Sequence, residues 1–233
     1  MIFKRQNWQE HLDTLNWRQG EHVLIAAPTG SGKSVLAGQL AEKRNYVANF
    51  ITKTKDPLFS GEQYKEWVRV TEWQPGRSPK AWENKVLLWP RELKTMAETR
   101  DNQKVIFRDA LEDVFKRGGW CLVFDELHYL ADQHFLNLSD AIAILFHMGR
   151  SNNVSLMALT QRPAWIPKII YSSVSHAYIA RTKDAADLKR LSDLAGLDPK
   201  KIQTAVSELP SRHDFLYVNP MGDHEPVIVN TRK

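Results

Sequence analysis

The segment that decides the fold is glycine-rich and reads Ala27-Pro28-Thr29-Gly30-Ser31-Gly32-Lys33-Ser34. It follows an apolar run at residues 22–26 and leads into a helical pattern at residues 35–43. A strand, a glycine-rich loop and a helix in this order are typical of a P-loop, in which backbone N–H groups and the positive end of the helix dipole hold phosphates. Ala27 stands where the usual pattern has its first glycine, but Gly30 and Gly32 still supply the flexible turn.

The last residues of this loop predict the chemistry of the site. Lys33 is placed to reach the β- and γ-phosphates of a nucleotide, and the Ser34 hydroxyl is placed to hold Mg²⁺. The segment from Ala27 to Ser34 is therefore the candidate ATP-binding loop, with ATP and Mg²⁺ as the expected cofactors. The alternative, a glycine-rich loop without a ligand, is disfavoured because Gly-Lys-Ser is intact between a predicted strand and a predicted helix.

A second candidate element is the apolar run at residues 120–124, which ends in the acids Asp125 and Glu126. Ligands of parallel sheets bind at the carboxyl ends of the strands, so both acids are expected to face the P-loop. Asp125 fits the role of orienting Mg²⁺ through its waters, and Glu126 that of polarising a water for attack on the γ-phosphate. This pair favours NTP hydrolysis over small-molecule kinase chemistry. The alternative is an acidic helix N-cap after a core strand.

The next predicted strand, at residues 154–159, is flanked by further candidate residues. It ends in Thr160-Gln161-Arg162-Pro163, and an amide at this place can contact both the γ-phosphate and the lytic water. Gln161 is therefore the predicted phosphate sensor, whereas Arg162 is either part of the sensor or a surface charge. Arg150 opens the loop before this strand. It is either an arginine finger for a neighbouring subunit's nucleotide or a cation that complements a helix C-terminus.

Composition limits the class of protein. A chain of 233 residues predicts a single α/β-sized domain, and its net charge of +5 is compatible with a nucleic-acid partner without establishing one. No apolar run reaches the length of a membrane span, and the N-terminus has no signal-peptide core. We therefore expect a soluble, cytoplasmic protein without a membrane partner. The single cysteine, Cys121, lies in an apolar run and is predicted to be a core residue rather than a nucleophile.

Strands that alternate with helices predict an α/β fold with a mostly parallel sheet and helices on both faces. Strands are expected at residues 22–26, 46–52, 85–89, 120–124, 154–159 and 177–180, and a hairpin at 214–218 and 226–229. Helices are expected at residues 35–43, 101–117, 140–148 and 184–195, and after Pro199. Residues 53–84 read as a loop-rich excursion. Residues 1–20 are predicted to be an N-terminal helical extension packed on the core, and residues 21–233 a single P-loop ATPase domain.

The order of the motifs resembles the FtsK/HerA superfamily of DNA-pumping ATPases. The resemblance rests on Gly149-Arg150, the following strand, the Thr160-Gln161-Arg162-Pro163 tip, and a strand that ends in Arg181 before an acidic helix start. It covers residues 21–218 and implies a RecA-like (ASCE) P-loop NTPase core. It also implies a homo-oligomeric ring, hexameric or pentameric, that threads double-stranded DNA. Arg150 matches the family's trans-acting arginine, and Arg181 matches a second arginine that contacts a neighbour's nucleotide.

The predicted motor is a minimal one. We expect it without the membrane segments, winged-helix domain or β-barrel cap of other members, a form that resembles the small DNA-packaging ATPases of some bacterial viruses. Such a role implies a capsid portal as docking partner and the host cytoplasm as location. A DNA-threading ring also implies cationic side chains that contact the DNA phosphates. The candidates are Lys53, Lys55, Arg77, Lys80 and Lys168, and for each the alternative is a scattered solubilising charge.

Other functions share part of this pattern. An AAA-like or RecA-like ATPase that remodels protein or loads a replication factor has the same first two motifs, but no reason to carry the Thr-Gln-Arg-Pro tip followed by Arg181. A nucleotide kinase is less favoured because the sequence shows no arginine-rich lid. A module that binds ATP without hydrolysis is disfavoured because Lys33, Asp125, Glu126 and Gln161 are all present.

Overall fold

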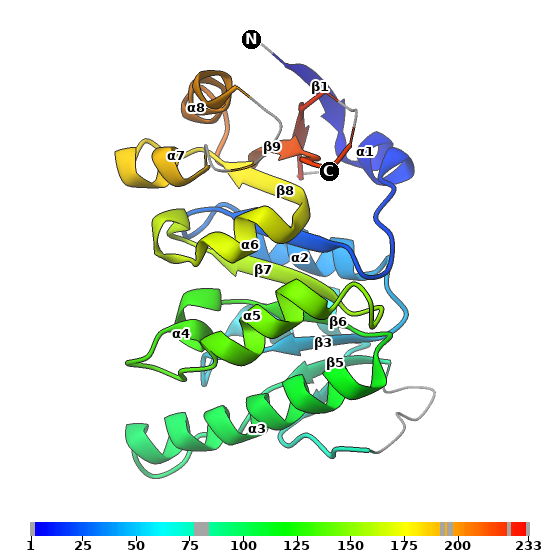
Figure 1. Cartoon of the computed structure of the whole chain (residues 1–233), viewed down its shortest axis with the longest axis vertical. Helices are drawn as coiled ribbons and strands as arrows, with labels where there is room; N and C mark the ends of the chain where they lie inside the picture. The colour runs from blue at the N-terminus through cyan, green and yellow to red at the C-terminus, as the bar shows by residue number, and fades with distance from the viewer. Residues whose placement is uncertain (1–2, 77–83, 192–193, 195–197, 223–224, 232–233) are drawn as a thin grey trace.

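One large sheet runs through the part of the chain that the structure, a computed structural model, describes: residues 3–76, 84–191, 194, 198–222 and 225–231. The strands in chain order are β1 (Lys4–Asn7), β2 (His22–Ala26), β3 (Val47–Phe50), β4 (Val68–Val70), β5 (Lys85–Leu88), β6 (Cys121–Phe124), β7 (Ser155–Thr160), β8 (Val174–Ala180), β9 (Asp214–Val218) and β10 (Val227–Asn230). Their order across the sheet is β1-β10-β9-β8-β2-β7-β6-β3-β5-β4 (Figure 1).

Most of this sheet is parallel. Only β9 runs against its neighbours, β8 and β10, in the described residues. Every residue of β2, β3, β6, β7 and β8 is buried, which explains why these segments are mostly apolar and do not alternate between apolar and polar residues. The predicted α/β class is confirmed, and β9 with β10 forms the predicted terminal hairpin.

Helices cover both faces of the sheet. They are α1 (Trp8–Thr14), α2 (Lys33–Ala41), α3 (Met96–Arg117), α4 (Leu127–Ala131), α5 (Ser139–Met148), α6 (Lys168–Ser173), α7 (Ala185–Leu191) and α8 (Pro199–Ser207), with short 3-10 turns η1 (Pro57–Ser60), η2 (Glu62–Tyr64) and η3 (Pro163–Trp165). One apolar cluster joins α3, α5, α6 and α8 to one face, and a second joins α1, α2, η1 and η2 to the other (Figure 1). Among the described residues, no helix combines the length and apolar character needed to cross a lipid bilayer.

The N-terminal segment is more varied than a helical extension. Residues 4–7 form β1, which pairs in parallel with β10, and only then does α1 begin. The β1 sequence, Lys-Arg-Gln-Asn, shows no apolar alternation because the strand lies at the edge of the sheet and is partly exposed. Asn7 and Glu10 form a capping box that starts α1, and Trp8 and Trp17 are buried against the core.

Cys121 lies within β6 and is fully buried. Burial raises the pKa of its thiol to about 12, since an apolar environment disfavours the thiolate. A protonated thiol is a poor nucleophile, so Cys121 has the properties of the predicted core residue.

Candidate nucleotide-binding site

The candidate P-loop connects the end of β2 to the start of α2. Gly30 and Gly32 have φ angles of 77° and 89°, a region in which residues with a Cβ are strained. Gly32 is the N-cap of α2 and provides no side-chain cap, so the first N–H groups of this helix remain available to a phosphate. The Ser31 hydroxyl donates to the Pro28 carbonyl oxygen and closes the turn.

Lys33, Ser34 and Asp125 meet at the end of β6. The Lys33 ammonium lies 3.3 Å from the Asp125 carbonyl oxygen, and Lys33 is buried. The Ser34 hydroxyl donates to Asp125 Oδ1 at 2.6 Å. A hydroxyl and a carboxylate side by side are the hard oxygen ligands that Mg²⁺ prefers, so these residues fit the predicted metal site.

A chain of hydrogen bonds links the predicted catalytic acid to the P-loop. Gln161 Nε2 donates to Glu126 Oε2 at 2.7 Å, and Thr29 Oγ1 donates to Gln161 Oε1 at 2.6 Å. Because a carboxylate only accepts, this arrangement uses both ends of the Gln161 amide. One side chain therefore touches both the acid and the loop that would receive the γ-phosphate.

The strand order explains why these residues converge. β7 lies between β2 and β6, and its last residue, Thr160, is in register with Ala26 of β2. The Ala27 N–H also donates to the Thr160 carbonyl oxygen at 2.9 Å. Three loops that are far apart in sequence thus leave the sheet at the same carboxyl edge, where ligands of parallel sheets bind.

A cavity of about 510 Å³ opens beside the acid and the amide. Both polar and aromatic side chains line it. It is lined by Pro28, Thr29, Glu126, His128, Tyr129, Phe135, Gln161, Arg162 and Trp165. Glu126 and Gln161 therefore face open space next to the P-loop, which a lytic water needs.

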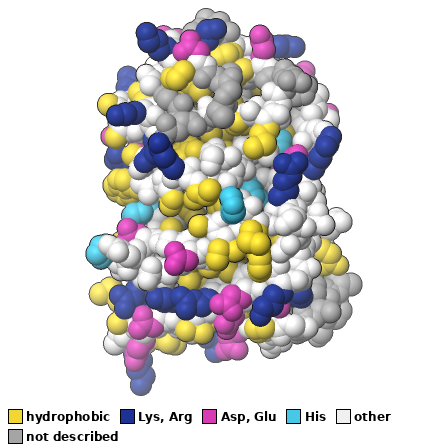
Figure 2. All heavy atoms as spheres, in the orientation of Figure 1, with side chains coloured by type: hydrophobic (Ala, Val, Ile, Leu, Met, Phe, Trp, Pro, Cys, Tyr) yellow, Lys and Arg dark blue, Asp and Glu magenta, His cyan; other side chains and the backbone are white. Residues whose placement is uncertain are grey.

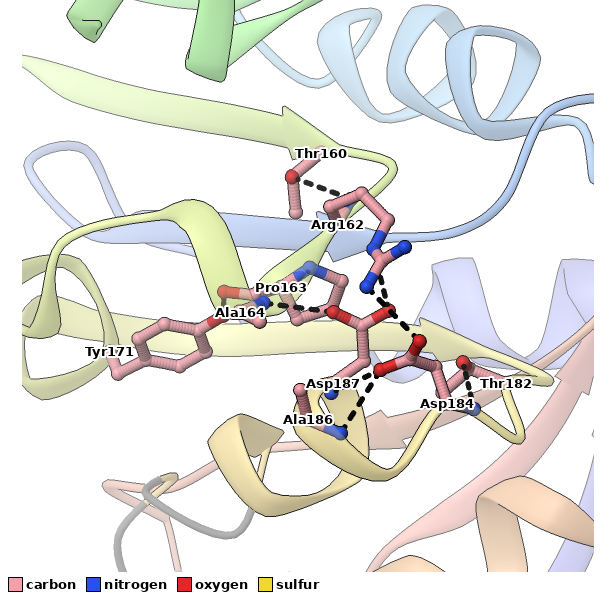
Figure 3. Close-up of polar contacts among 9 residues, drawn as sticks. All are labelled: Thr160, Arg162, Pro163, Ala164, Tyr171, Thr182, Asp184, Ala186 and Asp187. Atoms are coloured by element: carbon pink, nitrogen blue, oxygen red, sulfur yellow. Dashed lines mark hydrogen bonds and ion pairs between the residues drawn. The ribbon is translucent and has the colours of Figure 1, made fainter.

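Arg162 is held in an ion-pair cluster. Figure 3 shows its guanidinium directed at Asp184 and Asp187, with Nη2 3.1 Å from Asp184 Oδ2 and Nε 3.1 Å from Asp187 Oδ2. The Asp187 side chain is only 4% exposed and also accepts from the Ala164 N–H at 2.9 Å. These ion pairs connect the end of β7 to α7. They favour a structural role for Arg162 over that of a phosphate sensor.

We expect Arg162→Ala to lower the free energy of unfolding by about 1–3 kcal/mol, because it leaves the buried Asp187 carboxylate with one partner fewer. The partial exposure of Arg162 places the expected loss below that of a fully buried pair. Urea unfolding measures it, and Asp184→Asn, which changes only the exposed partner, is the control with a smaller effect. Unchanged stability together with lost ATP turnover would instead indicate the sensor role.

The two arginines predicted to act between subunits lie at opposite edges of the sheet. Arg181 follows β8 at the carboxyl edge, where its Nη1 lies 3.4 Å from the Leu209 carbonyl oxygen. Arg150 is exposed between α5 and β7, at the amino edge, where it lines a cavity of about 660 Å³ together with Glu21 and His176. The structure does not bring Arg150 to the P-loop of its own chain.

The described DNA-contact candidates lie in two places, in the loop after β3 and at the start of α6. Lys53 pairs with Asp56 Oδ2 at 2.8 Å; burial acts to lower its pKa, but this hydrogen bond and the charges of Asp125 and Glu126 raise the pKa above its ordinary value. Lys55 and Lys168 are exposed. On the face shown in Figure 2, Lys and Arg side chains are interspersed with Asp and Glu over α3. The remaining candidates, Arg77 and Lys80, lie outside the described residues.

His213 is a neighbour of the P-loop that the sequence does not predict. Its Nδ1 lies 3.2 Å from the Ser31 carbonyl oxygen, although 182 positions separate the two residues. No local motif marks this histidine, because its position depends on how the terminal hairpin folds back onto the sheet.

Solved structures share this architecture. The genome-packaging NTPase B204 from Sulfolobus turreted icosahedral virus 2 matches with a TM-score of 0.63 and 16% identity, over 93% of this chain and 99% of that one. B204, the DNA-packaging ATPase from Sulfolobus turreted icosahedral virus, matches with a TM-score of 0.61 and 20% identity, over 91% and 98%. This chain has the fold of these ATPases. The predicted α/β fold, a mostly parallel sheet covered by helices, is therefore confirmed, and these viral ATPases share it.

A further solved structure shows the same fold. VirB4 of Thermoanaerobacter pseudethanolicus matches with a TM-score of 0.58 and 13% identity, over 91% of this chain and 89% of that one. Further structures of the viral NTPase are complexes with ATP-gammaS and AMPPCP. No family model matches the chain, and no curated protein matches it.

Proposed function

We propose that this protein is an ATP-hydrolysing ring motor that translocates double-stranded DNA, as a phage genome-packaging ATPase. The observation that carries the proposal is the hydrogen-bonded chain from Thr29 through Gln161 to Glu126, next to the Ser34–Asp125 pair. Together they supply a phosphate loop, a metal site and a water-activating acid. The packaging role is supported by the fold shared with the viral NTPase over nearly the full length of both chains.

Each residue has a defined part in this mechanism. The P-loop N–H groups and Lys33 hold the β- and γ-phosphates, while Ser34, and Asp125 through water, hold Mg²⁺. At this site a Mg²⁺ ion would supply neutralisation of the charge on the phosphate oxygens. Glu126 accepts a proton from the attacking water. A carboxylate has about four acceptor positions, so it can do this while Gln161 still donates to Oε2. Gln161 then links the state of the γ-phosphate to the position of the acid.

Work on DNA requires that this site be coupled to cations in the ring pore. The exposed Lys55 and Lys168 are the simplest candidates, with Lys53, Arg77 and Lys80 as further ones. Arg150 and Arg181 would act on the nucleotides of neighbouring subunits, and a capsid portal would dock the ring.

We expect long duplex DNA to raise the steady-state ATP turnover of the purified protein. Lys55→Ala combined with Lys168→Ala should weaken this stimulation and leave the turnover without DNA unchanged, because neither residue lies among the P-loop residues. The stimulation should also fall steeply with salt, since phosphate contacts release counterions. Turnover that duplex DNA leaves unchanged would contradict the translocase proposal and favour a protein-remodelling ATPase.

A further inference from the structure

The contact between His213 and the P-loop extends the nucleotide site beyond its sequence motifs. His213 lies in the turn before β9, and its Nδ1 is 3.2 Å from the Ser31 carbonyl oxygen. A Cβ added to Gly32 would lie 3.4 Å from this nitrogen and 3.9 Å from Thr231 Oγ1. The imidazole therefore packs directly on the backbone of the loop.

The neighbouring arginine sets the tautomer of this histidine. Arg212 Nε donates to His213 Nε2 at 3.0 Å. A guanidinium can only donate hydrogen bonds, so Nε2 must accept, and the ring proton is on Nδ1. The contact with Ser31 is therefore a hydrogen bond from a neutral imidazole to the carbonyl oxygen.

A buried carboxylate fixes the turn that carries this histidine. Asp214 is 1% exposed and accepts from the Ser211 N–H at 3.1 Å, from Asn230 Nδ2 at 2.6 Å and from Arg5 Nη2 at 2.9 Å. The partners belong to the turn itself, to β10 and to β1. Strands from both ends of the chain thus hold His213 in place against the P-loop.

We infer that His213 is a positioning residue of the ATP site, which acts by orienting the peptide group between Ser31 and Gly32. A trans peptide is planar and carries its C=O and N–H on opposite sides. A donor that fixes the Ser31 carbonyl on one side therefore directs the Gly32 N–H to the other side, toward the phosphates. Donation to the carbonyl also polarises the peptide and strengthens that N–H as a donor. The inference rests on the proposed binding of ATP by this loop.

A matched pair of variants tests it. His213→Asn keeps a side-chain N–H close to the position of Nδ1, whereas His213→Leu has a similar size and no donor. We expect His213→Leu to weaken the binding of a fluorescent ATP analogue by about 3- to 10-fold, the value of one hydrogen bond. KM should rise by a similar factor with kcat close to that of the wild type, because a better-oriented N–H binds ground state and transition state alike. His213→Asn should retain most of the affinity.

The possible results distinguish the positioning role of His213 from the proposed binding of ATP by the P-loop. Equal affinity of the wild type and both variants overturns the inference, as does an equal loss in both variants accompanied by a lower melting temperature without nucleotide. The latter result would mean that the imidazole matters only for packing. A wild-type protein that binds the analogue no better than Lys33→Ala does would overturn the proposed function as well.

Discussion

Glu126→Gln is expected to lower the ATP turnover by about 10²- to 10⁴-fold, the range for loss of a positioned general base. The amide is isosteric with the carboxylate and can still accept the hydrogen bond from Gln161 Nε2, so the geometry of the site should persist. It cannot take a proton from the attacking water. Binding of ATP should remain, because Lys33 and the P-loop are unchanged. Phosphate release in single-turnover and steady-state assays measures the loss.

The same substitution at an exposed position controls for a general effect of charge. Glu92 is exposed and lies away from the P-loop in sequence, and Glu92→Gln should leave the turnover at the wild-type level. If Glu126→Gln retained turnover within about tenfold of the wild type, Glu126 would not be the general base. The site would then have to activate water in another way.

The sequence predicts the P-loop and the two acids after β6, because in each case a short segment determines both the local structure and the chemistry. The P-loop is set by two glycines between a buried strand and a helix, and the acids Asp125 and Glu126 directly follow a strand buried on both faces. Once the sheet is parallel, the carboxyl ends of its strands lie on one edge, so the meeting of P-loop and acids follows from topology. The roles assigned to these residues stay predictions.

The details that connect these segments depend on tertiary structure. The hydrogen bond between Thr29 and Gln161 spans 132 positions and requires β7 to lie next to β2. The buried Asp187 that holds Arg162 looks in the sequence like any acid near a helix start. The polar strand β1 carries no apolar pattern, because pairing with β10 rather than burial holds it in the sheet. Propensity and periodicity report the burial of apolar side chains, whereas these features are contacts between polar groups and leave no apolar pattern in the sequence.

Arg150→Ala is expected to lower the turnover of the assembled protein by about 10³- to 10⁵-fold, the contribution of an arginine finger, with ATP binding retained. The physical reason is the position of Arg150 relative to the P-loop. Arg150 is exposed at the amino edge of the sheet, whereas the P-loop, Asp125 and Glu126 lie at the carboxyl edge. A guanidinium in this position can stabilise charge only on a nucleotide held by another copy of the chain. Arg18 lines the same cavity and is also exposed, so Arg18→Ala is the matched control and should retain turnover.

Mixed assemblies test whether Arg150 acts between subunits. Arg150→Ala subunits retain Glu126, and Glu126→Gln subunits retain Arg150, so each variant alone lacks one group at every interface. When the two are mixed, interfaces form in which the Arg150→Ala subunit holds ATP and the other supplies the arginine, and these contain the complete set. Turnover should therefore recover in the mixture well above that of either variant. Recovery depends on the arginine crossing the interface, since a finger acting within its own chain would leave every subunit of the mixture deficient.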